Sequence, residues 1–349
     1  MTTATHAKWP TESLEQVDRC PVCTSTRRTL LYDNLTDRSE RVAPGTWTIH
    51  LCLGCGSAYL DPRPDPASVG RAYRTYHTHV DPATPAARGL AARLGRSLLN
   101  GYLNRRFNYD LRPAMSVGRL LVRVVPGAAG VAWRDVRCLP RLLPSGRLLD
   151  VGCGNGSFLL RMRDAGWEVE GIDPDPISVG LARNAGLHVT EGILSGETAG
   201  SARYDAVTMS HVIEHVHDPR AVLTECLRVL RPGGTLWIAT PNVGASGRRR
   251  FGPNWFPLDP PRHLVLFSRR SLEELLREVG FVIDHRPPPT PDATLWSDRA
   301  SHALAVGRNP YDPPSASKRL MFRALAADAR TFIRRHHEEQ IDLVARRPG

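Results

Sequence analysis

Four cysteines of this 349-residue chain form two C-x-x-C pairs, Cys20–Cys23 and Cys52–Cys55. Four thiolates at this spacing can surround one tetrahedral Zn²⁺, and the small residues that follow the pairs, Thr24 and Gly56, suit tight turns around such a metal. Because sulfur would fill all four positions, we expect a structural zinc that staples a small domain. Two disulfides or a redox-active pair are the alternatives, but the polar start Met1–Pro10 is no export signal and neither pair opens a helix beside a βαβ unit.

A glycine-rich turn, Gly152–Gly156, follows a short apolar run and precedes a helix-like segment. Strand, glycine turn and helix are typical of a nucleotide-binding α/β sheet. A dinucleotide fingerprint would need glycine where Ser157 stands, and no phosphate-binding lysine follows the turn. The next apolar run ends in Asp173, 23 residues after Asp150, at the place where a carboxylate can bind a ribose diol. The pattern predicts a cofactor that contains adenosine but no phosphate.

The glycine turn and the segments after it resemble those of the class I S-adenosylmethionine-dependent methyltransferases. The matching segments occur in family order and with family spacing at residues 148–156, 171–175, 204–207 and 230–236. The resemblance covers residues 145–285. It implies an α/β fold with a Rossmann-like core of seven strands, and S-adenosylmethionine as the cofactor.

The resemblance also implies which residues contact the cofactor. The glycine turn lets the backbone approach the methionyl part, and Asp173 holds the two ribose hydroxyls. The adenine lies beside the segment after the third strand, where Ile193 replaces the Asp of many members, so backbone groups or Glu191 would bind the adenine amine. The full expected set is Asp150, Gly152, Gly154, Gly156, Asp173, Pro174, Gly192, Ile193, Ser210 and His211.

Histidines and a glutamate follow the predicted fourth strand, residues 204–210, at the edge where a parallel sheet binds ligands. Methyl transfer is an in-line displacement that depends mainly on alignment, but an acceptor hydroxyl or acidic carbon must also lose a proton. We expect His215 to be the general base, oriented by Glu214, because a histidine titrates near neutrality. A structural role for this pair is the alternative, and His263 is the second candidate base.

A proline-rich and aromatic loop after the predicted fifth strand is the expected acceptor pocket. Trp255 and Arg262 are its candidate substrate contacts, because aromatic rings with a few polar groups suit an organic acceptor. A stiff loop without substrate contact is the alternative. The run Arg248–Arg250 precedes this loop and could favour an anionic acceptor.

The N-terminal part is predicted to help close the acceptor pocket. Cysteine pairs, a proline-rich step and a Tyr-x-x-Tyr helix ahead of the core resemble the zinc-bearing sugar C-methyltransferases of natural-product pathways. This resemblance makes Tyr73, Tyr76 and His77 candidate contacts to the substrate. Ordinary packing of aromatic residues in a helix is the alternative.

Three regions are predicted along the chain. A zinc-binding module covers residues 1–80, a helical connector or cap covers 81–144, and the methyltransferase domain covers 145–349, with a helical insertion at 286–339. Leucines at helical spacing in the connector predict an amphipathic helix that is buried on the core. The arginines that flank these leucines leave contact with a membrane surface as the alternative.

The net charge of +11 carries little weight in this assignment. Only two of the 46 basic residues are lysines, which is typical of GC-rich codon usage, and the basic residues are spread along the chain rather than gathered in one stripe. No run approaches the roughly 18 apolar residues of a membrane span. We expect a cytoplasmic enzyme that methylates carbon or oxygen of a small natural-product or sugar intermediate, without a nucleic-acid partner. An RNA methyltransferase is the first alternative, and a non-catalytic protein that binds cofactor or zinc is the second.

Overall fold

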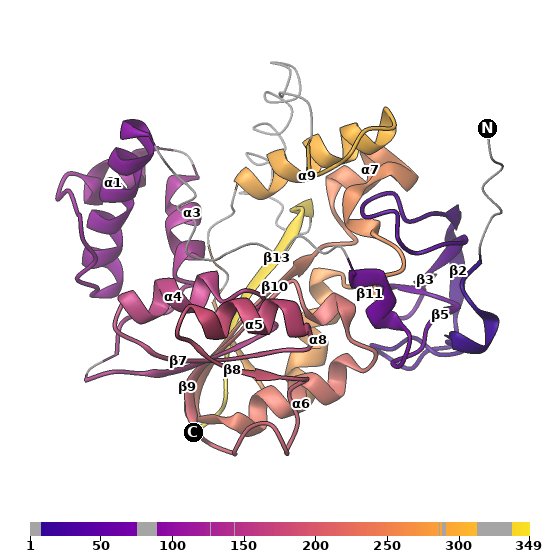
Figure 1. Cartoon of the computed structure of the whole chain (residues 1–349), viewed down its shortest axis with the longest axis horizontal. Coiled ribbons are helices and arrows are strands. Elements are labelled where there is room, and N and C mark those ends of the chain that lie inside the picture. The colour runs from indigo at the N-terminus through magenta and orange to yellow at the C-terminus, as the bar shows by residue number, and fades with distance from the viewer. Residues whose placement is uncertain are drawn as a thin grey trace.

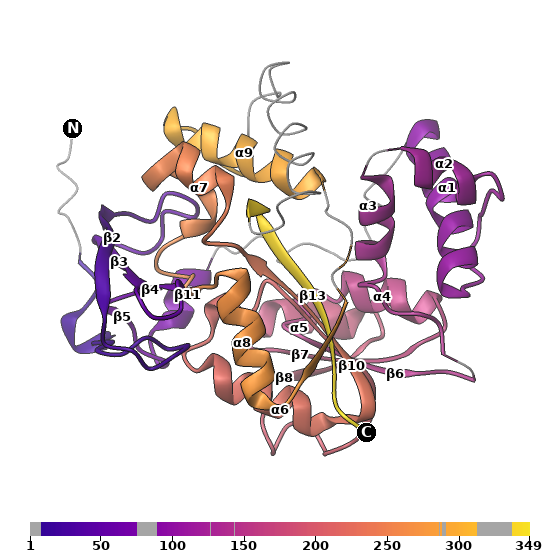
Figure 2. The ribbon, with the colours of Figure 1, turned by 180° about the vertical axis from the view of Figure 1, so that it is seen from behind.

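The structure is a computed structural model that describes residues 8–74, 89–125, 127–142, 144–285, 287, 291–312 and 337–349. A mixed α/β domain occupies the centre (Figure 1). A β-rich N-terminal module lies at one end of this domain, and three helices from the connecting region stand at the other end (Figures 1 and 2).

The central sheet has seven strands in the order β12-β13-β10-β9-β6-β7-β8. Strand β13 is antiparallel to both of its neighbours, and the remaining pairs are parallel. The strands are β6 (Arg147–Val151), β7 (Glu168–Asp173), β8 (His188–Glu191), β9 (Tyr204–Ser210), β10 (Leu230–Pro241), β12 (Val282–His285) and β13 (Gln340–Arg346). Apolar runs such as β6 and β9 are buried, as expected for a parallel sheet that is covered on both faces. The predicted α/β fold is confirmed.

Helices cover the two faces of this sheet. Helices α4 and α5 lie on one face, and α6 and α8 lie on the other (Figures 1 and 2). Their bounds are α4 (Ser157–Asp164), α5 (Pro176–Asn184), α6 (Pro219–Val229) and α8 (Arg269–Val279). Ser268 caps the start of α8, because Ser268 and Ser271 form a reciprocal capping box. Gly280 ends α8 in the left-handed conformation.

The N-terminal module contains one strand that comes from the central domain. Its sheet has the order β11-β4-β3-β2, and β11 is residues Val265–Leu266, which pair antiparallel with Ala58 and Tyr59 of β4. The other strands of the module are β1 (Leu14–Glu15), β2 (Arg28–Leu35), β3 (Trp47–Cys52), β4 (Ala58–Leu60) and β5 (Arg63–Pro64). The chain therefore returns to complete the module's sheet, which no motif in the sequence had indicated.

The connecting helices form a tightly packed pair and a third helix. They are α1 (Leu90–Phe107), α2 (Gly118–Val124) and α3 (Ala128–Asp135). A side chain at Gly101 or Gly118 would come within 1.9 or 2.0 Å of a backbone oxygen of the other segment, at Met115 or Leu98. Residue numbers fall along α1 as they rise along the segment that it contacts, so α1 and α2 are antiparallel. Their backbones nearly touch at these glycines.

The remaining helices are short or lie outside the two faces of the sheet. They are α7 (Ser246–Phe251), α9 (Pro291–Ala305) and the short 3-10 helices Thr11–Ser13, Val69–Tyr73, Ile213–His215, Gly252–Asn254 and Phe256–Leu258. Helix α9 falls within the predicted insertion at 286–339. Among the described residues, none of the helices has the length and apolar character needed to span a bilayer.

Candidate functional site

The expected cofactor residues gather at one edge of the central sheet. Strands β6, β7, β8 and β9 are parallel and in register, so their carboxyl ends lie side by side. The glycine turn 152–156, Asp173, Gly192 and Ser210 all stand at or just after these ends. Ligands of open parallel sheets bind at this edge.

The glycine turn needs its glycines for both conformation and space. Gly152, Gly154 and Gly156 have φ values of 69°, 53° and 82°, a left-handed conformation that side chains disfavour. A Cβ atom at Gly152 would lie 2.3 Å from the Val212 side chain, and one at Gly156 would lie 2.3 Å from Leu187. The turn is therefore held against the segment that follows β9, where the candidate bases stand.

Asp173 connects the end of β7 to the glycine turn. Its Oδ2 accepts a hydrogen bond of 2.7 Å from the Gly154 N–H, and its Oδ1 accepts one of 2.9 Å from the Asp175 N–H. Burial raises the pKa of Asp173, although these backbone donors oppose the shift. Each carboxylate oxygen keeps a further lone pair, so the position suits the binding of a diol.

Asp150 is buried in β6 beside a partner that the sequence did not reveal. Its Oδ1 accepts hydrogen bonds from Thr208 Oγ1 at 2.8 Å and from the Arg137 guanidinium, which also lies 3.5 Å from the centre of the Phe158 ring. Within the described residues Asp150 Oδ2 has no hydrogen-bond partner. Burial raises the pKa of Asp150, and the Arg137 charge opposes that shift. A buried, unpaired carboxylate oxygen beneath the glycine turn is a place where a further donor group fits.

The remaining expected cofactor residues lie at the same edge. Gly192 has φ 135°, and its N–H donates to the Asp173 carbonyl at 2.9 Å. The side chains of Pro174 and Ile193 are exposed, and that of Ser210 is partly buried. Nothing in the described residues covers the face of Ile193, so its side chain is open to a flat ligand.

His211 and Glu214 form one hydrogen-bond network after β9. His211 has φ 54°, its Nδ1 lies 3.2 Å from Glu214 Oε1, and its Nε2 lies 3.0 Å from Gln340 Oε1. The second Glu214 oxygen accepts a hydrogen bond of 2.9 Å from Thr240. Although burial alone would raise it, the hydrogen bond and charge of His211 lower the pKa of Glu214 to about 2. Within the described residues Glu214 is hydrogen-bonded to His211 and Thr240 and not to His215, so it orients His211.

His215 is oriented by a backbone carbonyl and a tyrosine. Its Nδ1 lies 3.0 Å from the Arg262 carbonyl oxygen and 2.8 Å from the Tyr73 hydroxyl. A carbonyl oxygen only accepts, so the bond to Arg262 requires the proton on Nδ1 and a lone pair on Nε2, and the Tyr73 hydroxyl fits this tautomer when it donates to the Arg262 carbonyl at 3.4 Å. Burial lowers the pKa of His215 to about 4, and the neighbouring His263 adds to this shift. The ring is therefore neutral at physiological pH, and a pKa this far below neutrality makes it a weaker base than the histidine titrating near neutrality that the sequence predicted.

His263 repeats this arrangement beside His215. Its Nδ1 lies 2.7 Å from the Pro257 carbonyl oxygen, and the two imidazole centroids are 4.7 Å apart. Donor atoms of Glu214, His215 and His263 all lie within 4.8 Å of one another. Two imidazoles and a carboxylate at this spacing can pass a proton or hold a divalent cation.

A family model described as a methyltransferase domain matches residues 133–286, the segment that contains the glycine turn, Asp173 and the histidines. This part of the chain is a methyltransferase domain. A ubiquinone biosynthesis O-methyltransferase of Xanthomonas campestris is 39% identical to it over 109 residues, which are 29% of this chain and 45% of that protein. The chain thus spans less than half the length of this curated relative.

Two further relatives cover more of the chain. A Mycolicibacterium smegmatis protein named as an S-adenosylmethionine-dependent methyltransferase is 29% identical over 209 residues, 57% of this chain and 79% of that protein. Among solved structures, the complex of the Haloferax volcanii Trm112 methyltransferase activator with a methyltransferase includes a chain with 18% identity and a TM-score of 0.45, covering 63% of this chain and 90% of that one.

Two expected substrate contacts, Arg262 and Trp255, are buried and hydrogen-bonded to other parts of the protein. Arg262 is fully buried, and its guanidinium donates to Asp37 at 2.5 Å, to Asp259 at 2.7 Å and to the Ala72 carbonyl at 3.1 Å. Trp255 is also buried, and its Nε1 donates to Glu339 at 2.9 Å. Neither side chain has a polar group left for an acceptor, so both position the loop. The sequence missed Asp37, because nothing in its local context marks a partner 225 residues away.

The N-terminal module supplies one candidate contact to the methyltransferase domain that the structure describes. Tyr73 is partly buried and lies against the His215 ring, with 5.8 Å between ring centroids. The other two expected contacts, Tyr76 and His77, lie outside the described residues.

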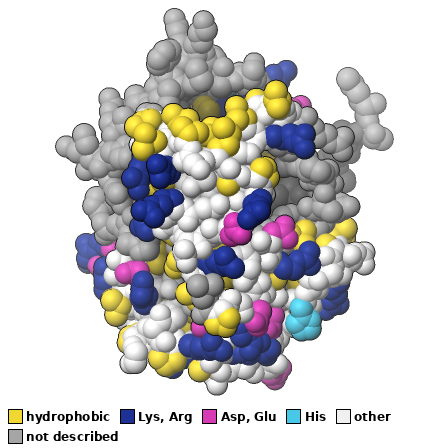
Figure 3. All heavy atoms as spheres, turned by 90° about the vertical axis from the view of Figure 1, so that its left-hand side faces the viewer, with side chains coloured by type: hydrophobic (Ala, Val, Ile, Leu, Met, Phe, Trp, Pro, Cys, Tyr) yellow, Lys and Arg dark blue, Asp and Glu magenta, His cyan; other side chains and the backbone are white. Residues whose placement is uncertain are grey.

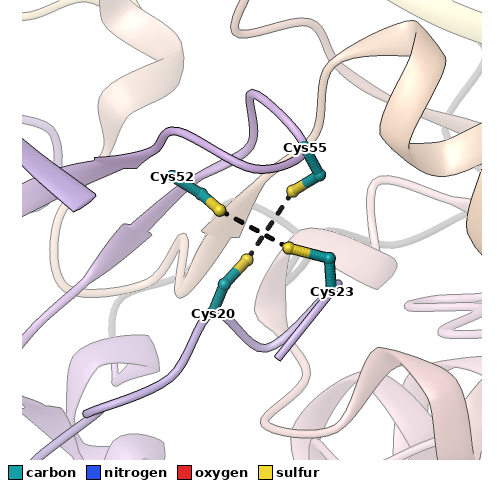
Figure 4. A group of neighbouring side chains, drawn as sticks. All are labelled: Cys20, Cys23, Cys52 and Cys55. Atoms are coloured by element: carbon teal, nitrogen blue, oxygen red, sulfur yellow. Dashed lines mark hydrogen bonds between the residues drawn. The ribbon is translucent and has the colours of Figure 1, made fainter. Parts of the chain in front are cut away.

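The four cysteines of the module point toward a common centre (Figure 4). Cys20 and Cys55 have their sulfurs 3.7 Å apart, and those of Cys23 and Cys52 are 3.5 Å apart. Zinc–sulfur bonds of about 2.3 Å in a tetrahedron place sulfurs about 3.8 Å from one another, so the spacing suits one zinc ion. Thr24 and Gly56 have φ values of 60° and 76°, which confirms the predicted tight turns.

Proposed function

We propose that the protein transfers a methyl group from S-adenosylmethionine to carbon or oxygen of a small molecule, with His215 as the general base. The cofactor would supply an electrophilic methyl group. The observation that carries the proposal is the hydrogen bond between His215 Nδ1 and the Arg262 carbonyl, which leaves the Nε2 lone pair for the proton of an acceptor. A base held neutral and oriented in this way can take the proton that the acceptor loses.

Each cofactor contact follows from the chemistry of the donor set. The glycine turn would admit the methionyl part close to the backbone, and Asp173 would accept hydrogen bonds from the ribose hydroxyls. The unpaired Oδ2 of Asp150 suits a cationic or hydrogen-bonding group below the turn. Exposed Ile193 would lie against the adenine ring. His211 and Ser210 would line the methyl-donor side at the end of β9.

The acceptor class is a natural-product or sugar intermediate. The name of the Xanthomonas relative supports methylation at oxygen, and the resemblance of the N-terminal module supports methylation at carbon. An anionic acceptor bound by Arg248–Arg250 has less support, because Arg248 donates to the Val243 carbonyl and Arg250 is paired with Asp298. The small-molecule class and the cytoplasmic location both stay predictions.

A structural zinc held by the four cysteines belongs to the same proposal. It would fix the two turns that carry the cysteines. The carbonyl of Cys55, in the second of these turns, accepts a hydrogen bond of 3.2 Å from Ser268 at the start of α8. No step of methyl transfer would involve this metal, since thiolates complete its coordination.

Incubation with labelled S-adenosylmethionine and metabolites of the neighbouring pathway, followed by mass spectrometry of the product, tests the activity. His215→Asn should lower the turnover by about 10²–10⁴ while cofactor binding, measured by calorimetry, is unchanged. His188→Asn, at an exposed position in β8, is the matched control. Full activity of His215→Asn would remove this residue from the reaction, and His263 would then be tested in the same way.

Two results would favour other functions. RNA binding that falls steeply with salt would support an RNA methyltransferase. Loss of cofactor binding in Asp173→Ala without loss of cellular function would support a non-catalytic protein. A requirement for an added divalent cation in the zinc-loaded protein would instead indicate that Glu214, His215 and His263 hold a cation.

A further inference from the structure

Helix α2 carries a row of apolar side chains that faces water. Val117, just before the helix, and Leu120, Leu121 and Val124 are 47%, 62%, 41% and 71% exposed. Their spacing of three and four residues places them on one side of a helix. The opposite side, with Gly118 and Val122, is buried against α1. The helix therefore leaves most of its apolar side chains in water, unlike an ordinary surface helix.

The start of α1 extends this apolar row. Leu90 and Leu94 are 85% and 49% exposed. Because α1 and α2 are antiparallel, and Leu98 lies beside Gly118, the start of α1 runs beside the end of α2. Val125, just after α2, is exposed as well. We call these residues together the α1–α2 surface; they are Leu90, Leu94, Val117, Leu120, Leu121, Val124 and Val125.

Unpaired arginines surround the α1–α2 surface. Residues 89–125 contain seven arginines and a single acidic residue, Asp110. Arg93, Arg105, Arg119 and Arg123 are exposed, and none of these four forms an ion pair within the described part of the chain. Figure 3 looks onto this end of the molecule and shows apolar and basic side chains next to one another. The region thus combines a local excess of positive charge with exposed apolar groups.

We propose that the α1–α2 surface docks the protein on a lipid bilayer that contains anionic phospholipids. Apolar side chains can enter the acyl boundary while neighbouring guanidinium groups bind the phosphates of the headgroups. The arginines match the negative leaflet in charge. A nucleic acid would bind the arginines through its phosphates, but its charged phosphates would then also lie against the apolar side chains of the α1–α2 surface. A protein partner would have to bring its own carboxylates to four arginines.

Flotation of the purified full chain with vesicles tests the proposal. The protein should bind vesicles of phosphatidylcholine and phosphatidylglycerol and should bind pure phosphatidylcholine vesicles much more weakly. Arg119→Gln with Arg123→Gln should weaken binding to the anionic vesicles by about 30-fold, because each guanidinium near an anionic surface contributes about a fivefold factor. Leu120→Asp with Val124→Asp should abolish binding to both. Ile177→Asp, at an exposed apolar position in α5, is the matched control and should bind as the wild type does.

Circular dichroism and thermal unfolding of every variant separate loss of the surface from loss of the fold. Methyl transfer to a soluble acceptor should be unchanged in the Leu120/Val124 variant, so failure of the membrane proposal and failure of the proposed function are distinguishable. Equal binding by all variants, or no binding to anionic vesicles, would overturn the proposal. So would a dimer, or a complex with RNA, that the same substitutions disrupt in place of vesicle binding.

Discussion

The N-terminal module and the α1–α2 surface are both additions to the central sheet, but they meet it in opposite ways. The module is completed by β11 from the central domain and is joined to it through buried Arg262, which lies between Asp37 and Asp259. The α1–α2 pair closes on itself through Gly101 and Gly118 and leaves its apolar side in water. One addition shares a sheet and a buried ion-pair network with the central domain, and the other presents a free surface.

Arginine occurs in both regions: Arg262 joins the module to the central domain, and exposed arginines surround the α1–α2 surface. Arg262 is fully desolvated, and two carboxylates compensate its charge, which raises its pKa despite burial. Arg119 and Arg123 have no carboxylate near them among the described residues and stay in solvent. The functional meaning of an arginine-rich composition is therefore decided by where the acidic partners lie, and the net charge of +11 contains no such information.

Removal of the zinc is expected to have the largest effect, and it should disrupt the N-terminal module, which is integrated with the central domain. Cys20→Ser should lower the zinc content from one per chain to near zero, and the module should unfold, because the binding free energy of a structural zinc, about 10–16 kcal/mol in small zinc domains, is largely its folding free energy. Metal analysis and limited proteolysis measure the two effects. Cys138→Ser, at a buried cysteine outside the cluster, is the control and should keep the metal. Unchanged zinc in Cys20→Ser would refute the four-thiolate site.

Replacement of Arg262 should have the next largest effect. Arg262→Ala leaves Asp37 and Asp259 buried without their partner, which should lower the free energy of unfolding by about 3–5 kcal/mol in urea titrations. Arg220→Ala removes an exposed ion pair with Glu278 and should change it by less than about 1 kcal/mol. Equal losses in the two variants would mean that the buried arginine is not what joins module and core.

The sequence predicted the parts of the site that local patterns encode. The glycine turn after β6, the position of Asp173 at the end of β7 and the grouping of the four cysteines were predicted because each depends on spacing within a few residues. Long-range partners were not predictable in this way. The pairing of β11 with β4, the Asp37–Arg262 bond and the Arg137–Asp150 bond join residues whose local contexts are ordinary. Trp255 and Arg262 were expected to contact the substrate and are buried instead for the same reason, since their partners Glu339 and Asp37 come from distant parts of the chain.

The pH dependence of turnover tests whether the buried environment of His215, to which Tyr73 of the N-terminal module contributes, lowers the pKa of this residue. With the pKa of His215 lowered to about 4, its base form persists at pH 6, so kcat/KM should stay flat between about pH 6 and 8 and fall only below about pH 5. The unfolded histidine titrates near 6.5, so this residue also costs stability as the pH falls from about 6.5 to 4. Tyr73→Phe keeps the Arg262 carbonyl bond and should slow turnover by less than about tenfold. An acid limb near pH 6.5 would contradict the buried, oriented base.

The smallest effect is expected on the free surface, and two valines of one helix show it. Val124→Gln replaces an exposed side chain of α2, so the free energy of unfolding should change by no more than about 0.5 kcal/mol. Val122→Gln places an amide on the side of the same helix that is buried against α1, and the desolvated amide should cost about 1–3 kcal/mol. Urea denaturation of the two variants compares the same substitution, Val to Gln, at an exposed and at a buried position. A large loss in Val124→Gln would mean that the apolar row is covered in solution, and the surface would then belong to the fold, as the N-terminal module does.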